Sequence, residues 1–222
     1  MSIAIAIDGP AGAGKSTISK SAAKELGFIY VDTGALYRTV GLASLRNNVE
    51  AVAGETLDKM LESITVELTF NEKGEQIVLL DGENVSDYIR TPEASMLASK
   101  ISAIPSVRAY LLDLQRNMAK TNNVIMDGRD IGTVVLPNAE VKIFLTASSL
   151  VRAQRRHAEL LAKGEEADIA QIEADIIKRD EQDMNRAVSP LKQAEDAVLI
   201  DSSYMTIDEV VARIMSEAEK IA

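Results

Sequence analysis

The sequence of 222 residues contains no cysteine and a single histidine, His157. Without cysteine, the chain cannot form a disulfide framework, a thiolate nucleophile or a zinc site with cysteine ligands. One histidine disfavours a Ser-His-Asp triad and a metal site built from several histidines. His157 lies in a charged helical segment, and we interpret it as a bystander. The absence of cysteine also fits a reducing compartment.

Long apolar runs and excess positive charge are missing as well. Residues 1–7 are apolar but too short to cross a membrane, and they lack the basic segment of a signal peptide. No later run reaches that length without a charge, so we expect a cytoplasmic protein with no membrane partner. The net charge of −10 argues against a nucleic-acid partner, which would need a broad basic surface. Basic side chains that bind an anionic ligand must therefore be gathered in one cleft.

Apolar residues (46%) and charged residues (26%) occur in the proportions of one globular domain, which we place at residues 1–222. Residues 3–7 alternate isoleucine with alanine and are apolar on both sides, which is typical of a strand buried between two layers. A glycine-rich loop, a helical stretch and a second apolar strand at 28–31 follow. This βαβ order predicts an α/β fold with a parallel sheet flanked by helices. Further buried strands are expected at 124–126, 141–145 and 198–200.

Two regions differ from this core pattern. Apolar and polar residues alternate over 64–70, a turn is expected at 71–74, and a second strand follows at 76–80. The pattern predicts a half-exposed antiparallel hairpin, which we interpret as an insertion of about residues 64–86. Residues 149–186 are helical in pattern and rich in charges of both signs, and we expect them to lie outside the core.

The glycine-rich loop has the Walker A spacing G-x-x-x-x-G-K-S over residues 9–16. Its glycines let backbone N–H groups point at a phosphate, and the following helix adds the positive end of its dipole. Lys15 supplies a charge for the β- and γ-phosphates, and Ser16 can ligate Mg²⁺. The predicted ATP-binding residues are Gly9, Pro10, Ala11, Gly12, Ala13, Gly14, Lys15, Ser16 and Thr17.

Proteins with this loop include switch GTPases, motor ATPases and small-molecule kinases. No Asn-Lys-x-Asp motif for reading guanine occurs in the sequence, which disfavours a switch GTPase. Asp127 ends an apolar strand and could orient Mg²⁺ through a water molecule. The alternative is that Asp127 is only a turn residue at the end of a strand.

Several short motifs resemble those of nucleoside monophosphate kinases, and bacterial cytidylate kinases in particular. They are Asp-Thr-Gly-Ala-Leu-Tyr-Arg at 32–38, Ala-Ser at 98–99, Pro-Ser-Val-Arg at 105–108, Asp-Gly-Arg-Asp-Ile-Gly-Thr at 127–133 and Arg-Asp-Glu-Gln-Asp-Met-Asn-Arg at 179–186. The resemblance extends over essentially the whole chain. It implies a P-loop kinase fold with a five-stranded parallel sheet, a monophosphate-binding region of about 33–110 and a lid of about 149–186. It also implies phosphorylation of CMP, and of dCMP, by ATP with Mg²⁺, in pyrimidine nucleotide metabolism.

The same resemblance implies roles for individual residues. Arg38, Arg129, Arg186 and Thr33 would hold the acceptor phosphate, Ser99, Arg108 and Asp130 would read the base, and Arg179 and Asp183 would contact the ribose. Arg152, Arg155 and Arg156 fall in the lid, where similar kinases place arginines on the transferring phosphate. The predicted catalytic set is Lys15, Arg129, Arg186, Arg152 and Arg156, and the predicted metal ligands are Ser16 and Asp127.

The base-reading assignment can be judged chemically. Cytosine offers an amino donor beside two acceptors, so Asp130 would accept from the amino group while Arg108 donates to the acceptor side. Uracil would place a carbonyl opposite Asp130, and an unpaired buried acceptor costs about 1–3 kcal/mol. The pair therefore predicts a preference for CMP over UMP. The alternative is that Asp130 only forms an ion pair with a neighbouring arginine.

Other interpretations remain open. The acceptor could be UMP, dCMP or a small metabolite, and the chain could be a nucleotide-dependent switch without kinase turnover. Arg152, Arg155 and Arg156 could pair with nearby glutamates such as Glu159. We expect four further arginines, Arg46, Arg90, Arg116 and Arg213, to be solvated. No feature demands a protein partner, so a monomer is the default expectation.

Overall fold

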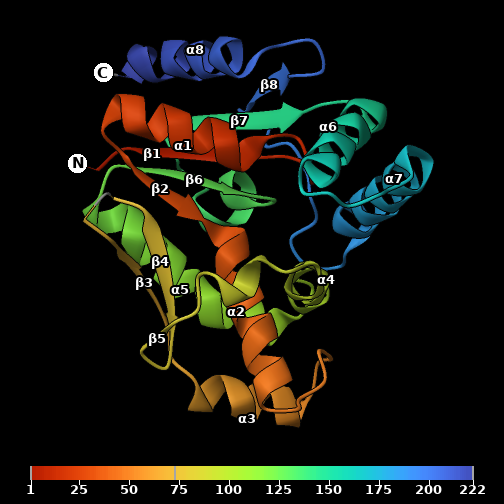
Figure 1. The fold of residues 1–222 in the computed structure, drawn as a ribbon. Helices are drawn as coiled ribbons and strands as arrows, with labels where there is room; N and C mark the ends of the chain where they lie inside the picture. Colours follow the sequence, from red (N-terminus) through yellow and green to blue (C-terminus); the bar gives the residue numbers. More distant parts are fainter. Residues whose placement is uncertain (1, 73, 222) are drawn as a thin grey trace.

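The structure is a computed structural model, and it describes residues 2–72 and 74–221. It contains a five-stranded parallel sheet and a small antiparallel sheet, with helices on both faces of the parallel one (Figure 1). The parallel sheet has the order β2-β6-β1-β7-β8, and the antiparallel sheet has the order β3-β4-β5. The parallel architecture predicted from the sequence is thus confirmed.

The strands are β1 (Ala4–Asp8), β2 (Ile29–Asp32), β3 (Val66–Phe70), β4 (Gln76–Leu80), β5 (Glu83–Asn84), β6 (Val124–Gly128), β7 (Val141–Thr146) and β8 (Val198–Asp201). The α-helices are α1 (Lys15–Leu26), α2 (Thr33–Arg46), α3 (Glu55–Ser63), α4 (Pro92–Ile101), α5 (Pro105–Thr121), α6 (Ser149–Ala162), α7 (Ile169–Asn185) and α8 (Ile207–Ala218). Three short elements complete the fold: the 3₁₀ turns η1 (Tyr88–Arg90) and η3 (Glu219–Ile221) and the π-helical turn η2 (Ile131–Val135).

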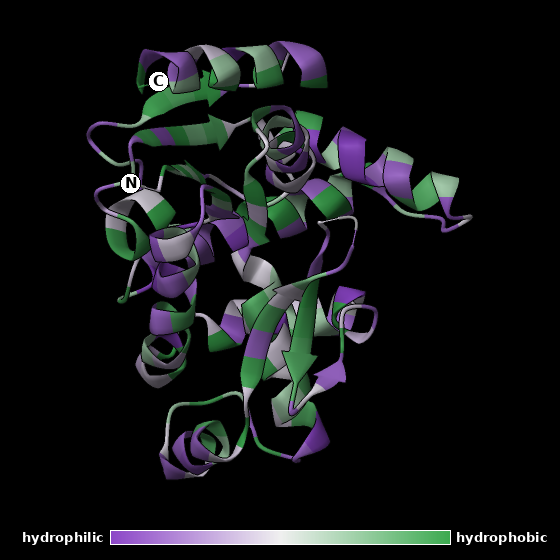
Figure 2. Ribbon diagram, turned by 90° about the vertical axis from the view of Figure 1, so that its left-hand side faces the viewer, coloured by the Kyte–Doolittle hydropathy of each residue, from purple (hydrophilic) through white to green (hydrophobic). Residues whose placement is uncertain are grey.

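The central strand β1 is buried on both faces, as its sequence predicts. Ile5 and Ile7 are fully buried and pack in a cluster with residues of α1, α8, β7 and β8. Ala4 and Ala6 face the other way, toward β6, α5 and η2. Burial of an isoleucine side chain stabilises a fold by about 1.5–3 kcal/mol, so this strand anchors the two helical layers. Figure 2 shows the hydrophobic residues concentrated along the strands.

The carboxyl ends of three adjacent strands bring acidic residues together at one edge of the parallel sheet. Asp32 at the end of β2 lies beside Asp127 in β6, and Ile7 of β1 pairs with Asp127 on its other side. Asp8 follows and lies beside Gly128. In open parallel sheets ligands bind at this edge, so the strand register places the site.

A second core lies around α2, where α3, α4, α5 and the antiparallel sheet pack together. Leu36, Ile101 and Leu111 are fully buried there, and Val78 of β4 packs against them. Figure 1 shows α2 leaving the edge of the parallel sheet and running toward α3. The predicted hairpin is confirmed as β3 and β4, paired from Val66 with Leu80 to Phe70 with Gln76. The sequence did not predict β5, which has only two residues, both exposed.

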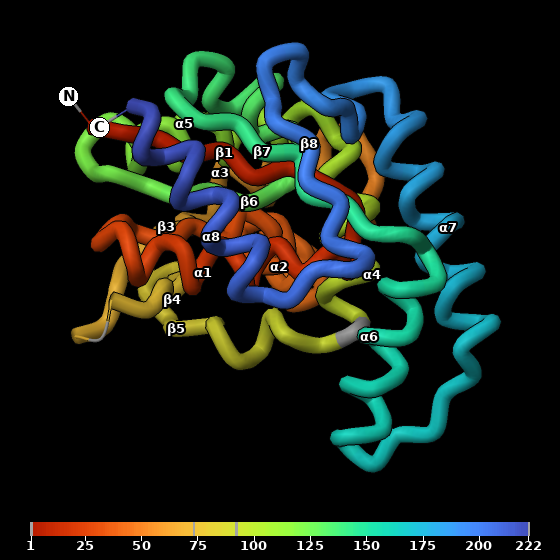
Figure 3. The backbone as a smooth tube through the Cα atoms, turned by 90° about the horizontal axis from the view of Figure 1, so that it is seen from above, coloured from red at the N-terminus to blue at the C-terminus, as the bar shows by residue number. Residues whose placement is uncertain are grey.

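Helices α6 and α7 pack against each other and extend away from the sheet as a helical hairpin (Figure 3). We call this segment, Ser149–Asn185, the α6–α7 hairpin. Ser148 caps α6 by accepting a hydrogen bond from the Val151 N–H, and Asp168 caps α7 by accepting from Ala170. None of the described helices has the length and apolar character needed to cross a membrane.

The interpretation of Arg116 as a solvated arginine is wrong. Its guanidinium donates from Nε to the Val135 carbonyl at 3.1 Å and from Nη2 to the Val134 carbonyl at 3.0 Å. These carbonyls belong to η2, a π-helical turn that the sequence did not predict. Arg116 on α5 therefore supports the turn that follows Asp130.

Candidate active site

A cleft of about 680 Å³ opens at the carboxyl edge of the parallel sheet. It is lined by the glycine-rich loop, by α2, α4 and α5, by the segment after β6, by α6 and α7, and by α8 and the loop before it. The predicted site residues that line it are Ala11, Gly12, Gly14, Lys15, Ser16, Thr17, Thr33, Arg38, Ser99, Arg108, Asp127, Arg129, Asp130, Arg179, Asp183 and Arg186. Gly9, Pro10, Ala13, Arg152 and Arg156 do not line it.

The glycine-rich loop leads directly from β1 into α1. Gly9 has φ 151°, and a Cβ atom there would lie 1.9 Å from the Leu145 carbonyl oxygen, so only glycine fits. The Lys15 ammonium donates to the Gly9 carbonyl at 2.8 Å and to the Pro10 carbonyl at 2.7 Å. Burial lowers the pKa of Lys15 below its usual value, and the nearby charge of Arg129 lowers it further. An anion close to Lys15 would offset both effects.

Ser16, at the start of α1, and Asp127, in β6, are hydrogen-bonded to each other. The Ser16 hydroxyl donates to Asp127 Oδ2 at 2.9 Å, and the Tyr30 hydroxyl donates to Oδ1 at 3.1 Å. Burial raises the pKa of Asp127, and the neighbouring charge of Asp32 raises it as well. A buried carboxylate beside a hydroxyl suits a hard cation with oxygen ligands. Among the described residues no group of three or more His, Cys, Asp or Glu could hold a metal, so phosphate and water would have to supply the other ligands.

Several arginines in the cleft have unused hydrogen-bond donors. Arg38 donates to Asp32 at 2.8 Å and Arg129 donates to Asp183 at 2.9 Å. Yet two buried nitrogens, Arg38 Nε and Arg179 Nε, have no hydrogen-bond partner within the described parts of the chain, and Arg186 Nη2 has only an ion-pair contact with Asp130 at 3.5 Å. A buried donor left without a partner costs about 1–3 kcal/mol, so such donors are suited to receive an anionic ligand. Burial lowers the pKa of Arg179 and, separately, that of Arg186.

Arg108 and Asp130 form a buried ion pair through Arg108 Nη2 and Asp130 Oδ2. Arg186 Nη2 lies 3.5 Å from the other carboxylate oxygen. Burial raises the pKa of Asp130, while the charges of Arg108 and Arg186 lower it. The sequence left open whether Asp130 pairs with an arginine or reads a base, and the structure contains the pair. A carboxylate has about four lone-pair sites and a guanidinium five N–H donors, so the pair leaves hydrogen-bonding capacity on both groups.

The three arginines of α6 occupy different environments. Arg152 is buried and donates to the carbonyls of Ala147 and Ala11, both at 2.9 Å, and to Asp180 at 2.6 Å. Arg155 lines the cleft and donates to the hydroxyl and carbonyl of Ser202. Arg156 is exposed and pairs with Glu159 at 3.1 Å. The structure therefore places Arg155 in the cleft, whereas the predicted catalytic set contains Arg152 and Arg156.

Sequence reasoning missed Asp8, which connects the glycine-rich loop with the turn after Asp130. Its side chain is 4% exposed and accepts hydrogen bonds from the N–H groups of Ile131 at 2.8 Å and Gly132 at 2.7 Å. Asp8 directly precedes Gly9, and it thus joins the start of the glycine-rich loop to the turn that follows Asp130. Its position at the end of a buried strand, like that of Asp127, was the signal that could have identified it.

The environment of Asp8 predicts a pH effect on stability. Burial raises its pKa from 3.8 to about 6, although the two backbone hydrogen bonds lower it. Between about pH 4 and pH 6 the folded state retains a proton on Asp8 that the unfolded state has lost. The contribution of Asp8 to the free energy of unfolding therefore falls by about 3 kcal/mol as pH rises through this window. Urea unfolding at pH 4, 5, 6 and 7 should show the wild type losing stability relative to Asp8→Asn.

Asp201→Asn is the matched control, because hydrogen bonds from Ser203 lower the pKa of Asp201. Its stability contribution has the opposite sign: it is present above the usual pKa of an aspartate and is lost as pH falls below it. Parallel stability curves for the wild type and Asp8→Asn across this range would contradict the assignment.

The sequence matches the family model described as "Cytidylate kinase" over residues 5–220. The curated "Cytidylate kinase" of Carboxydothermus hydrogenoformans is 50% identical over 211 residues, which cover 95% of each chain. The "Cytidylate kinase" of Caldicellulosiruptor bescii is 51% identical over 219 residues, which cover 99% of this chain and 96% of the relative.

Solved structures with much lower sequence identity share the fold. An uncharacterised protein from Eubacterium ventriosum matches with a TM-score of 0.56 and 11% identity, covering 96% of both chains. A gluconokinase from Sinorhizobium meliloti matches with a TM-score of 0.51 and 13% identity, covering 99% of this chain and 93% of that one. These two likenesses concern the fold alone. The family model and the two curated relatives, which each cover nearly the whole chain, show that this protein belongs to the cytidylate kinase family.

Proposed function

We propose that this kinase transfers the γ-phosphoryl group of ATP to CMP, and to dCMP, by direct in-line displacement within the cleft. The observation that carries the proposal is the buried Arg108–Asp130 pair, which lies in the same cleft as the glycine-rich loop and the arginines with unused donors. This arrangement offers a base-reading pair, an anion site and a nucleoside triphosphate site within one cavity. The reaction belongs to pyrimidine nucleotide metabolism.

The donor side is formed by the glycine-rich loop, residues 9–17, and the start of α1. Its backbone N–H groups bind the β-phosphate, and the Lys15 ammonium turns from the Gly9 and Pro10 carbonyls to the β- and γ-phosphates. Mg²⁺, ligated by the Ser16 hydroxyl and oriented by Asp127, would neutralise phosphate charge when bound. Lys15 then carries its full positive charge, because the bound phosphates raise the pKa that burial lowers.

The acceptor side needs positive charge but no general base. An oxygen of the acceptor phosphate is already ionised near neutral pH and attacks the γ-phosphorus directly. The bond from the γ-phosphorus to the β–γ bridging oxygen breaks, and its electron pair leaves with ADP. Arg38, Arg129 and Arg186 hold the acceptor phosphate in line and reduce repulsion between the two polyanions, with the Thr33 hydroxyl beside them.

The base is read by Asp130 and Arg108, together with Ser99, which lines the same cleft. Asp130 accepts from the amino group of cytosine, and the N–H donors that Arg108 retains face the acceptors of the base. Arg179 and Asp183 meet the ribose hydroxyls. Asp183 also accepts a hydrogen bond from Arg129 through its Oδ2 atom. The carboxylate that meets the ribose therefore also positions an arginine that holds the acceptor phosphate.

We assign acceptor binding to the region of about 33–110 and a closing lid to the region of about 149–186. The α6–α7 hairpin extends from the body and carries Arg155 and Arg179 into the cleft, which supports the lid assignment. Closure would exclude water that competes for the γ-phosphoryl group. We also predict that the protein is a monomer, requires Mg²⁺ and is cytoplasmic.

Turnover with MgATP against CMP, dCMP, UMP, AMP and GMP tests the proposal. We expect kcat/KM for CMP to exceed that for UMP by about tenfold or more, because uracil leaves Asp130 facing a carbonyl. In Asp130→Asn the amide can donate to that carbonyl, so the preference should shrink at least several-fold. Asp58→Asn, a change at an exposed residue of α3, serves as the matched control and should keep the preference.

Other outcomes would count against the proposal in different ways. Fast turnover with another base would retain the kinase and reject the reading of Asp130 and Arg108. Absence of turnover with every monophosphate would reject the acceptor class, and slow hydrolysis of the triphosphate alone would favour a switch.

A further inference from the structure

The turn that follows α7 makes several contacts with the base-reading pair. Ser189 in this turn has φ 49°, in the left-handed region that a serine seldom occupies. The Leu191 N–H donates to the Asp183 carbonyl at 2.8 Å, which folds the turn back onto the end of α7. Arg186 Nε donates to the Ser189 carbonyl. We call residues 186–191 the Ser189 turn. Contacts hold the turn at both ends, and the Ser189 hydroxyl accepts a hydrogen bond from Arg108, which lines the cleft.

Arg108 is fixed by three different elements. Its Nε donates to the Ser189 hydroxyl at 3.1 Å, its Nη1 donates to the Ser102 carbonyl at 3.0 Å, and its Nη2 donates to Asp130. The guanidinium also lies over the Tyr37 ring, with 5.6 Å between its carbon and the ring centre. These contacts use three of the five N–H donors of an arginine, and the remaining two lie on the η nitrogens. The orientation of those two donors is therefore set by the three contacts together.

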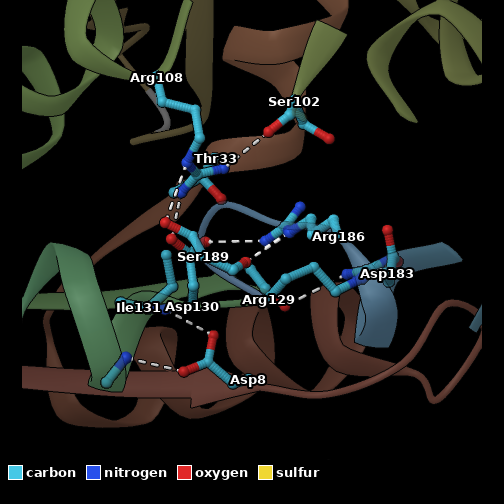
Figure 4. Close-up of polar contacts among 12 residues, drawn as sticks. Asp8, Thr33, Ser102, Arg108, Arg129, Asp130, Ile131, Asp183, Arg186 and Ser189 are labelled. Atoms are coloured by element: carbon cyan, nitrogen blue, oxygen red, sulfur yellow. Dashed lines mark hydrogen bonds and ion pairs between the residues drawn. The ribbon is translucent and has the colours of Figure 1, made fainter. Parts of the chain in front are cut away.

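Figure 4 shows Arg108, Asp130 and the two residues of the Ser189 turn, Ser189 and Arg186, pointing toward one another from three segments of the chain. The Ser189 side chain also lowers the pKa of Asp130, after the charges of Arg108 and Arg186. The Ser189 hydroxyl thus accepts a hydrogen bond from Arg108 and influences the carboxylate that pairs with it. Of the three contacts to Arg108, the Ser102 contact is a backbone carbonyl and Asp130 is itself a base reader. Only the Ser189 hydroxyl can be deleted without altering a proposed base reader.

From this geometry we propose that Ser189 is a positioning residue for base selection. Its hydroxyl holds the Arg108 guanidinium in one plane. In this orientation the two remaining N–H donors face the base of the acceptor nucleotide, beside Asp130. The inference rests on the proposed function, because it deepens the assignment of Arg108 and Asp130 as base readers. Without the hydroxyl, Arg108 Nε is left as a buried donor and the guanidinium can rotate, so the pair distinguishes cytosine from uracil less well.

The Ser189 turn also connects base selection to the acceptor phosphate. Arg186, proposed to hold that phosphate, donates to the Ser189 carbonyl and lies 3.5 Å from Asp130. This contact uses the backbone of Ser189 and survives any change of its side chain. Deleting the hydroxyl should therefore affect the base more than the phosphate, so that KM for CMP changes more than kcat.

The experiment compares Ser189→Ala, Ser189→Gly and the wild type for kcat and KM with CMP, UMP and ATP. Both variants remove the hydroxyl, but glycine adopts φ 49° without strain, whereas alanine does not. We expect both to raise KM for CMP about tenfold and to lower the CMP to UMP ratio of kcat/KM about tenfold. The kcat with CMP and the KM for ATP should stay within about threefold of the wild type. Ser63→Ala, which removes a hydroxyl bonded to the Met60 carbonyl on α3, is the matched control.

The outcomes separate the inference from the proposed function. If the wild type prefers CMP and both variants keep that preference, the positioning role of Ser189 is rejected and the proposed function stands. If only Ser189→Ala loses the preference, the hydroxyl is not required, because Ser189→Gly lacks it as well, and the role of the hydroxyl is rejected. If the wild type itself does not prefer CMP, the assignment of Arg108 and Asp130 as base readers is wrong, and the inference about Ser189 is overturned with it. A fall in kcat with CMP and UMP alike would indicate a structural role and would also overturn the inference.

Discussion

Replacement of Lys15 by methionine is expected to lower kcat for phosphoryl transfer by at least about a thousandfold while the protein stays folded. Loss of one well-placed donor to a developing charge commonly costs a factor of about 10²–10³, and Lys15 also supplies a full charge to two phosphates. No other lysine lines the cleft among the residues that the structure describes. A steady-state assay with MgATP and CMP measures the change.

The fold should survive this change because Lys15 forms no ion pair with the residues that the structure describes. Its ammonium donates to the carbonyls of Gly9 and Pro10, and burial disfavours its charge. Lys15→Met removes these two hydrogen bonds but also removes a charge that burial disfavours, and the two effects offset each other. We expect the free energy of unfolding to stay within about 1 kcal/mol of the wild type or to increase.

Lys20→Met is the matched control, because Lys20 lies on the same helix, is exposed and faces the Tyr30 ring at 5.5 Å. Its kcat should remain within about twofold of the wild type. If Lys15→Met retained a tenth of the wild-type kcat, the assignment of Lys15 to the transferring phosphate would be wrong.

Local sequence patterns predicted the parts of this protein that local physics determines. The glycine-rich loop depends on residues adjacent in sequence, and its strand, turn and helix appear where they were expected. The buried strands were visible as short apolar runs, and alternation over 64–70 identified the hairpin that became β3 and β4. Each of these features has a signal that one short window of sequence contains.

Contacts between distant segments could not be predicted in this way. Asp8 and Ile131 are 123 positions apart, and Arg108 and Ser189 are 81 positions apart. No local pattern distinguishes Asp8 from any other aspartate at the end of a strand. The π-helical turn after Asp130 is held by Asp8 on one side and Arg116 on the other, so its conformation depends on two remote side chains. For the same reason the sequence identified base-reading candidates but missed the serine beside them.

The arginines of α6 show how far burial decides the consequence of a substitution. Arg152→Met should lower the free energy of unfolding by about 3 kcal/mol, because it removes one partner of a buried ion pair and two bonds to backbone carbonyls. The Asp180 carboxylate would lose its charged partner, and water could solvate it only slightly because its side chain is only 15% exposed. Arg156→Met, four positions along the same helix, should change stability by no more than about 0.5 kcal/mol, because its pair with Glu159 is exposed. Urea unfolding of both variants gives the comparison.

A double variant determines the cause of the loss. If the penalty of Arg152→Met comes from the unpaired Asp180 charge, adding Asp180→Asn should restore part of the lost stability, about 1 kcal/mol or more. If it comes only from the bonds to Ala147 and Ala11, the second substitution should restore nothing. Equal losses for Arg152→Met and Arg156→Met would contradict the buried bridge altogether. Arg152 also donates to the Ala11 carbonyl of the glycine-rich loop, and this hydrogen bond connects the α6–α7 hairpin to the donor site. Arg152→Met should therefore also raise KM for ATP.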